Sequence, residues 1–141
     1  MLNVIYGHDQ LIRMDATLKT LTDVIPEGAV IKLDSARKVE LTGDDASAED
    51  FIWWAFNSAN VEDEINTAFK ATGKITLLAN SVFIAETDQF AADTYALGNK
   101  LASESGKLLK GATGDFAVAR ALGPVVNGLL TFVSLSLASK I

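Results

Sequence analysis

The segment GAVIKLDSARKV at residues 28–39 decides the fold, because a second segment, GNKLASESGKL at residues 98–108, follows the same plan. Each begins with glycine, continues as a short aliphatic run, turns at an acidic–serine–small triplet, and resumes with lysine and an aliphatic residue. Small polar residues between two such runs are typical of the tight turn in a β-hairpin. Each segment therefore predicts two short strands joined by a turn.

Three further blocks recur in the same order along the chain. The triplet TGD at residues 42–44 corresponds to TGD at 113–115, the apolar block 51–56 to residues 116–122, and residues 73–78 to 128–133. Blocks that recur in one order indicate an internal repeat. We therefore predict a β domain over residues 25–141 with an internal duplication, its copies spanning residues 25–79 and 95–138.

The fold class that follows is mainly β with a minor helical part: a small β-barrel or sandwich built from two duplicated strand meanders. Asn127 and Gly128 are a hairpin signal before the last strand. Residues 60–73 predict one short inserted helix, with a capping Asn60, acids in its first turn and Gly73 after it. Residues 1–24 lie outside the repeat, and they predict either an N-terminal arm that docks on a partner or an edge strand.

Composition excludes several classes of protein. The chain has 141 residues, 49% of them apolar and 21% charged, which is typical of a globular domain. Its net charge of −6 opposes binding to a phosphate backbone, so we expect no nucleic-acid partner. The absence of cysteine excludes disulfides and thiolate metal sites. The sequence shows neither a secretory signal nor the roughly 20 consecutive apolar residues of a membrane helix, so we expect no membrane partner.

Motifs for chemistry are weak. The acidic residues Asp44, Asp45, Glu49 and Asp50 lack the spacing of a calcium loop, which makes solvated loop charges the better interpretation. His8 is the single histidine, and no nucleophile motif lies beside it. We therefore expect no enzyme, no catalytic residue, no cofactor and no metal site.

The adjacent tryptophans Trp53 and Trp54 are the strongest anchors for an interface. In a strand they point to opposite faces, so one would lie in the core and the other could reach an interface, where aromatic residues contribute most of the binding energy. Together with apolar residues of the N-terminal segment they make up the candidate interface: Leu2, Val4, Tyr6, Leu11, Ile12, Trp53 and Trp54.

Turn and strand signatures are concentrated between Leu77 and Ser136. They are SVF at 81–83, TDQF at 87–90, YALGNKL at 95–101, GKL at 106–108, GDFAVARAL at 114–122 and NGLLT at 127–131. In these signatures the second half resembles the capsid decoration proteins of tailed bacteriophages, also called head-stabilising or cement proteins.

The resemblance implies a non-enzymatic component of the virion, a structural protein that stabilises the capsid by bridging its subunits. Such a protein is made in the host cytoplasm, binds the major capsid protein on the outer surface of the capsid, and assembles with itself, often as a homotrimer. The predicted helix, the tryptophan pair and residues 1–24 have no match in that family. Other virion roles, as a tail-tube subunit, a connector or the base of a head fibre, therefore stay open, as does a small carbohydrate-binding β domain.

Overall fold

The computed structural model describes residues 1–7, 11–21, 23–42, 52–59, 73–79 and 81–141. Strands form its regular secondary structure, and the described residues contain no helix. The predicted mainly β fold is therefore confirmed, whereas the helix predicted over residues 60–73 lies, apart from Gly73, outside the described residues. The strands are β1 (Leu2–Tyr6), β2 (Arg13–Leu18), β3 (Val30–Leu33), β4 (Lys38–Leu41), β5 (Ile52–Ala55), β6 (Lys74–Ala79), β7 (Ile84–Thr87), β8 (Lys100–Glu104), β9 (Lys107–Lys110), β10 (Phe116–Ala121) and β11 (Leu130–Lys140).

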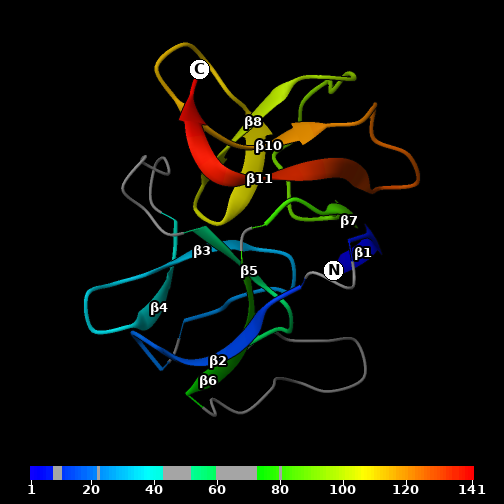
Figure 1. The fold of residues 1–141 in the computed structure, drawn as a ribbon. Helices are drawn as coiled ribbons and strands as arrows, with labels where there is room; N and C mark the ends of the chain where they lie inside the picture. Colours follow the sequence, from blue (N-terminus) through cyan, green and yellow to red (C-terminus); the bar gives the residue numbers. More distant parts are fainter. Residues whose placement is uncertain (8–10, 22, 43–51, 60–72, 80) are drawn as a thin grey trace.

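The strands form two sheets that lie one above the other in Figure 1. Five of them close a barrel in the order β2-β4-β3-β5-β6, and we call residues 11–79 the barrel half. The other six form a sheet in the order β1-β7-β11-β10-β8-β9, and we call β1 together with residues 81–141 the sheet half. The predicted β-barrel is therefore present.

The N-terminal segment contributes a strand to each half. Among the described strands β1 pairs with β7 alone and forms an edge of the sheet, while β2 lies between β4 and β6 in the barrel. Ala16 and Leu18 of β2 are buried among the barrel residues. Within this segment β1 is therefore an edge strand, whereas β2 lies between two neighbours in the barrel. Docking of residues 1–24 on a partner as an arm stays a prediction.

The two halves share one arrangement of strands. The order β4-β3-β5-β6-β2 of the barrel corresponds to β9-β8-β10-β11-β7 of the sheet, and each adjacent pair listed in these two orders is antiparallel. β2 and β4 close the barrel as a parallel pair, and Phe90, just after β7, makes a parallel bridge to Leu108 of β9. The register agrees as well, since Val30↔Trp54↔Leu78 in the barrel half matches Lys100↔Arg120↔Val133 in the sheet half.

Apolar side chains form two clusters, and one of them joins the halves. The first fills the barrel with residues such as Ile31, Val39 and Leu77. The second combines Val30, Ile52, Trp54 and Leu78 of the barrel half with the interior of the sheet half, including Phe83, Leu101, Leu130 and Phe132. Because successive strand residues point to opposite faces, the outer face of β5 and β6 becomes the floor of this second core.

Backbone and hydroxyl groups also tie the β8–β9 turn to the barrel half. The amide of Val30 donates to the carbonyl oxygen of Gly106 at 2.8 Å. The buried Thr42 hydroxyl accepts from the amide of Gly106 and from the hydroxyl of Ser103, both at 3.1 Å. Buried polar groups cost stability unless they are hydrogen-bonded, so these bonds fix how the halves meet.

Candidate interaction surface

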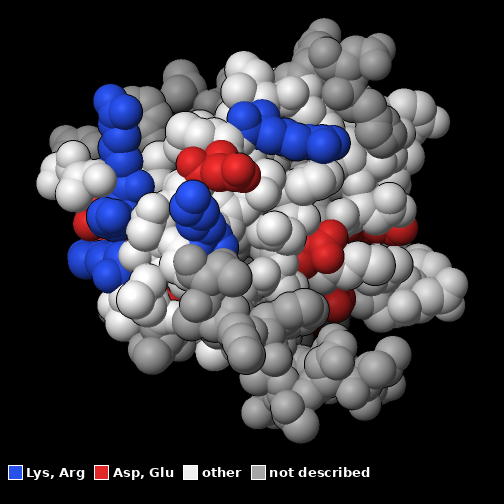
Figure 2. Space-filling model, turned by 90° about the horizontal axis from the view of Figure 1, so that it is seen from below, with Lys and Arg blue, Asp and Glu red and all other residues white. Residues whose placement is uncertain are grey.

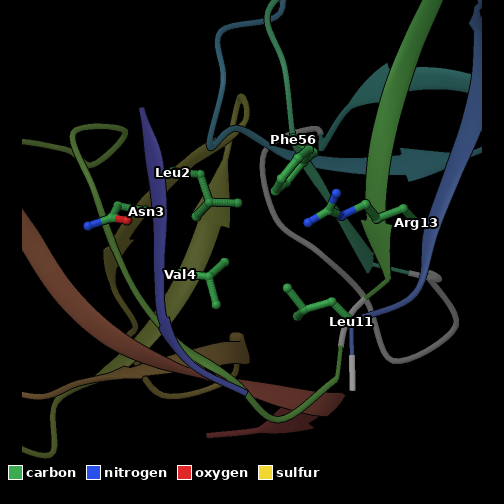
Figure 3. A pocket seen from close by; sticks show the side chains of 6 residues that line it. All are labelled: Leu2, Asn3, Val4, Leu11, Arg13 and Phe56. Atoms are coloured by element: carbon green, nitrogen blue, oxygen red, sulfur yellow. The ribbon is translucent and has the colours of Figure 1, made fainter. Parts of the chain in front are cut away.

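A cavity of about 210 Å³ lies between β1 of the sheet half and the start of the barrel half. Leu2 and Val4 point from β1 toward Leu11 and Phe56, with Asn3 on the other side of the strand (Figure 3). Arg13, the first residue of β2, completes the lining. The described lining residues are therefore mainly aliphatic and aromatic, and Arg13 is the cationic one among them.

The guanidinium of Arg13 lies 4.2 Å from the centre of the Phe56 ring. A cation over an aromatic face is attracted by the ring quadrupole, which holds the side chain against the cavity wall. Arg13 and Phe56 are brought together by β6, since Arg13 pairs with Leu78 and the amide of Phe56 donates to Thr76. The arrangement suits contact with an apolar group that carries a carboxylate or carbonyl near its end.

The start of β1 is held by contacts to both halves. The Met1 amino group donates to the Glu27 carbonyl oxygen at 2.8 Å and to Asp88 Oδ1 at 2.5 Å. Burial raises the pKa of the Asp88 carboxyl, but hydrogen bonds from the amino group and from Gln89 outweigh it and leave that pKa below its ordinary value. Gly28 lies so close that a Cβ there would be 2.5 Å from the Met1 carbonyl oxygen.

Large apolar side chains are exposed beside the residues that line this cavity. Tyr6, at the end of β1, is 67% exposed, and Ile12, between the lining residues Leu11 and Arg13, is 64% exposed. Tyrosine is among the residues that most often anchor protein interfaces, and an exposed isoleucine adds apolar contact area. We call Leu2, Val4, Tyr6, Leu11, Ile12, Arg13 and Phe56 the junction surface.

Of the seven candidate interface residues, five belong to the junction surface. Leu2, Val4 and Leu11 line the cavity, while Tyr6 and Ile12 are exposed beside it. Leu2 is only 6% exposed, so most of its surface is already used within the chain.

The two tryptophans point to opposite faces of β5, as the alternation of a strand requires. Trp53 is half-buried and packs against the barrel core. Trp54 is completely buried, stacked on Phe132 at 4.8 Å between ring centres and edge-on to Phe83 at 6.0 Å. The interface that Trp54 anchors is therefore the one between the two halves of this chain, which leaves no surface of this side chain for a partner.

Sequence reasoning missed Arg13 and Phe56. Phe56 ends the apolar block 51–56, which was a usable signal. Arg13 carried none, because its contact with Phe56 depends on the pairing of β2 with β6.

The other residues considered for chemistry are not placed by the structure. His8 and the acidic residues Asp44, Asp45, Glu49 and Asp50 lie outside the described residues. Within the described part of the chain, histidine, aspartate and glutamate form no cluster of three that could hold a metal ion. The described residues likewise include no helix that is long and apolar enough to cross a bilayer.

Charges of both signs are interspersed on the barrel half. Figure 2, which views the molecule from below, shows basic side chains on either side of an acidic one. Glu40 accepts from Lys19 at 2.9 Å and lies 4.0 Å from Lys32. The hydrogen bond and the charge of Glu40 raise the pKa of Lys19.

Neither a protein-family model nor a curated protein sequence matches this chain.

Proposed function

We propose that this protein is a structural virion protein that decorates a bacteriophage capsid and stabilises it by bridging capsid subunits. The observation that carries the proposal is the set of turn and strand signatures between Leu77 and Ser136. Apart from SVF at 81–83, which directly precedes β7, they fall on the strands and turns from β7 to β11, so they lie in the sheet half rather than being scattered over the molecule.

Exposed apolar side chains support a role in binding other proteins. Apolar side chains such as Tyr6, Ile12, Leu97 and Val126 are more than half exposed. Many modest contacts repeated over a lattice produce strong overall attachment without a single tight site. In this proposal the protein acts on the outer face of the capsid as a homo-oligomer, a trimer by the resemblance, with the major capsid protein as its partner.

Co-sedimentation with capsids tests the proposal. Purified protein is mixed with particles of the encoding phage that lack it, and the bound fraction is measured after pelleting. We expect saturable binding. A protein that stays in the supernatant at every concentration would contradict the proposed function.

A pair of variants tests whether the junction surface makes the contact. We expect the double substitution Tyr6→Ser with Ile12→Ser to weaken binding about tenfold or more, a loss of about 1.4 kcal/mol, because tyrosine is among the residues whose truncation costs an interface most. The matched control is Leu97→Ser with Val126→Ser, which removes apolar side chains of similar exposure that do not belong to the junction surface. Equal weakening by both pairs would move the contact away from the junction surface and leave the function standing.

A further inference from the structure

Among the residues that the structure describes, no strand pairs with one edge of the first half of β2. The amide of Leu18 donates to the carbonyl oxygen of Gly73 at 3.0 Å, and the amide of Ala79 donates to the carbonyl oxygen of Ile12 at 2.8 Å. The even-numbered residues from Ile12 to Leu18 therefore direct their backbone N–H and C=O groups toward β6. The backbone groups of Arg13 and Asp15 therefore point the other way. β4 covers that side only at Thr17 and Leu18, and no described residue bonds to the outward backbone groups of Arg13 and Asp15.

The sheet half shows what such an edge can hold. β7 corresponds to β2, and the bond from Ser134 to Phe83 at 2.9 Å corresponds to the bond from Ala79 to Ile12. The outward residues of β7 are thus Ile84 and Glu86, and β1 pairs with them antiparallel. An antiparallel strand therefore fits beside β7, and by correspondence beside the first half of β2. In the barrel half, no described strand occupies that place.

The open edge is complementary to itself. Two copies of β2 can pair antiparallel about a two-fold axis, with odd-numbered residues exchanging hydrogen bonds. An axis at Arg13 places the two arginines opposite each other. An axis at Asp15 places the two aspartates opposite each other, and it also requires each Arg13 to pair with Thr17, whose backbone β4 already covers. Only an axis at Met14 places each Arg13 opposite an Asp15 of the partner subunit. Opposite charges on facing residues stabilise such pairs, and like charges destabilise them.

We propose that β2 pairs with β2 of a second copy of this chain, in the register centred on Met14, and joins two barrels into a continuous sheet. Met14, which is half-buried, then contacts its own counterpart. Ile12, 64% exposed in the single chain, lies opposite Ala16 of the partner subunit and is covered. A contact of about five residues a side is small, so the dimer forms reversibly with concentration.

This inference does not depend on capsid binding. It is also separate from the trimer that the resemblance implies. A two-fold contact joins two copies into a dimer, whereas a trimer needs a three-fold arrangement of copies. Sedimentation of the purified chain distinguishes the two, since a pure trimer shows no dimer at any concentration.

Charge reversal tests the register by sedimentation equilibrium at protein concentrations up to about 1 mM. We expect Arg13→Asp and Asp15→Arg each to raise the dimer dissociation constant about tenfold, because each places like charges opposite each other twice. The double variant restores opposite charges, and its dissociation constant should return to within about threefold of the original. Lys100→Glu in β8 is the control and should leave the constant unchanged.

Folding of each variant is measured in parallel by circular dichroism. Both side chains also make contacts within the chain, because Arg13 contacts Phe56 and Asp15 accepts a hydrogen bond from the Thr76 hydroxyl at 2.8 Å. Amide hydrogen exchange supplies a second readout: exchange at Arg13 and Asp15 should slow as protein concentration rises, while Glu86, already paired with β1, should not change. A chain that stays monomeric at every concentration would overturn the proposal. So would a dimer that is unaffected by either single reversal, or one that leaves the two amides unprotected.

Discussion

At the position where the barrel half has Trp54, the corresponding residue of the sheet half is Arg120, and where it has Val30 the sheet half has Lys100. Trp54 and Val30 are completely buried against the sheet half, whereas Arg120 is exposed. The same backbone arrangement thus carries an apolar outer face in one copy and a charged one in the other.

Trp54 should therefore contribute far more to stability than its neighbour. We expect Trp54→Ala to lower the free energy of unfolding by about 3–5 kcal/mol, because it empties the space between Phe83 and Phe132. Trp53→Ala, at a half-buried site, should cost about 1–2 kcal/mol. Urea denaturation followed by circular dichroism measures both. Equal losses would show that Trp54 does not join the halves.

The candidate site could be predicted in part at this scale. The alternation of a strand predicts that Trp53 and Trp54 separate, but not which one faces the barrel interior, since that depends on what covers the outer face of β5. Leu2, Val4 and Leu11 were selected as apolar residues of the N-terminal segment, and they line the cavity. These side chains are partly buried within the chain because β1 pairs with β7, and no local sequence pattern predicts that pairing.

At the scale of elements, β1 is the strand on which the junction surface depends. It is held by its ladder with β7, by the contacts of Met1 with Glu27 and Asp88, and by the close approach of Gly28. Gly28 has φ +88°, a conformation that side chains with a Cβ rarely adopt.

A pair of glycine substitutions isolates the docking of β1. Gly98 has nearly the same φ, +86°, but a Cβ there would meet nothing within 4 Å. Gly98→Ala should cost about 1–2 kcal/mol of stability from the backbone conformation alone. Gly28→Ala should cost about 1–3 kcal/mol more, since its Cβ would collide with the Met1 carbonyl and Thr87 Oγ1. Thermal or urea unfolding measures the difference, and equal losses would mean that β1 is not held against Gly28.

The elements themselves were largely predictable because their signals are local. The turns at 34–37 and 104–107 connect β3 to β4 and β8 to β9, where the small polar residues indicated them. The division of the strands between a closed barrel and a six-stranded sheet was not predictable. β2 pairs with β4 and β6, and β1 with β7, and such long-range partners are selected by packing rather than by local sequence.

At the scale of the whole molecule, two copies of one strand arrangement share a core, and their polar outer surfaces are interrupted by exposed apolar residues. A molecule of this construction offers strand edges and apolar anchors to other proteins. These are the features that a lattice-binding protein needs, since repeated weak contacts add up across neighbouring subunits. The junction surface and the open edge of β2 share Ile12 and Arg13, so capsid binding and pairing of two copies would compete for these residues.

The disruption temperature of capsids, with and without the protein, tests the central proposal most directly. Particles lacking the protein are heated alone, with saturating protein, and with the Tyr6→Ser, Ile12→Ser variant, and release of DNA is followed by dye fluorescence. The account predicts a clear rise in disruption temperature with the protein, and a smaller rise with the variant at the same concentration. Identical disruption temperatures with and without the unmodified protein would contradict it.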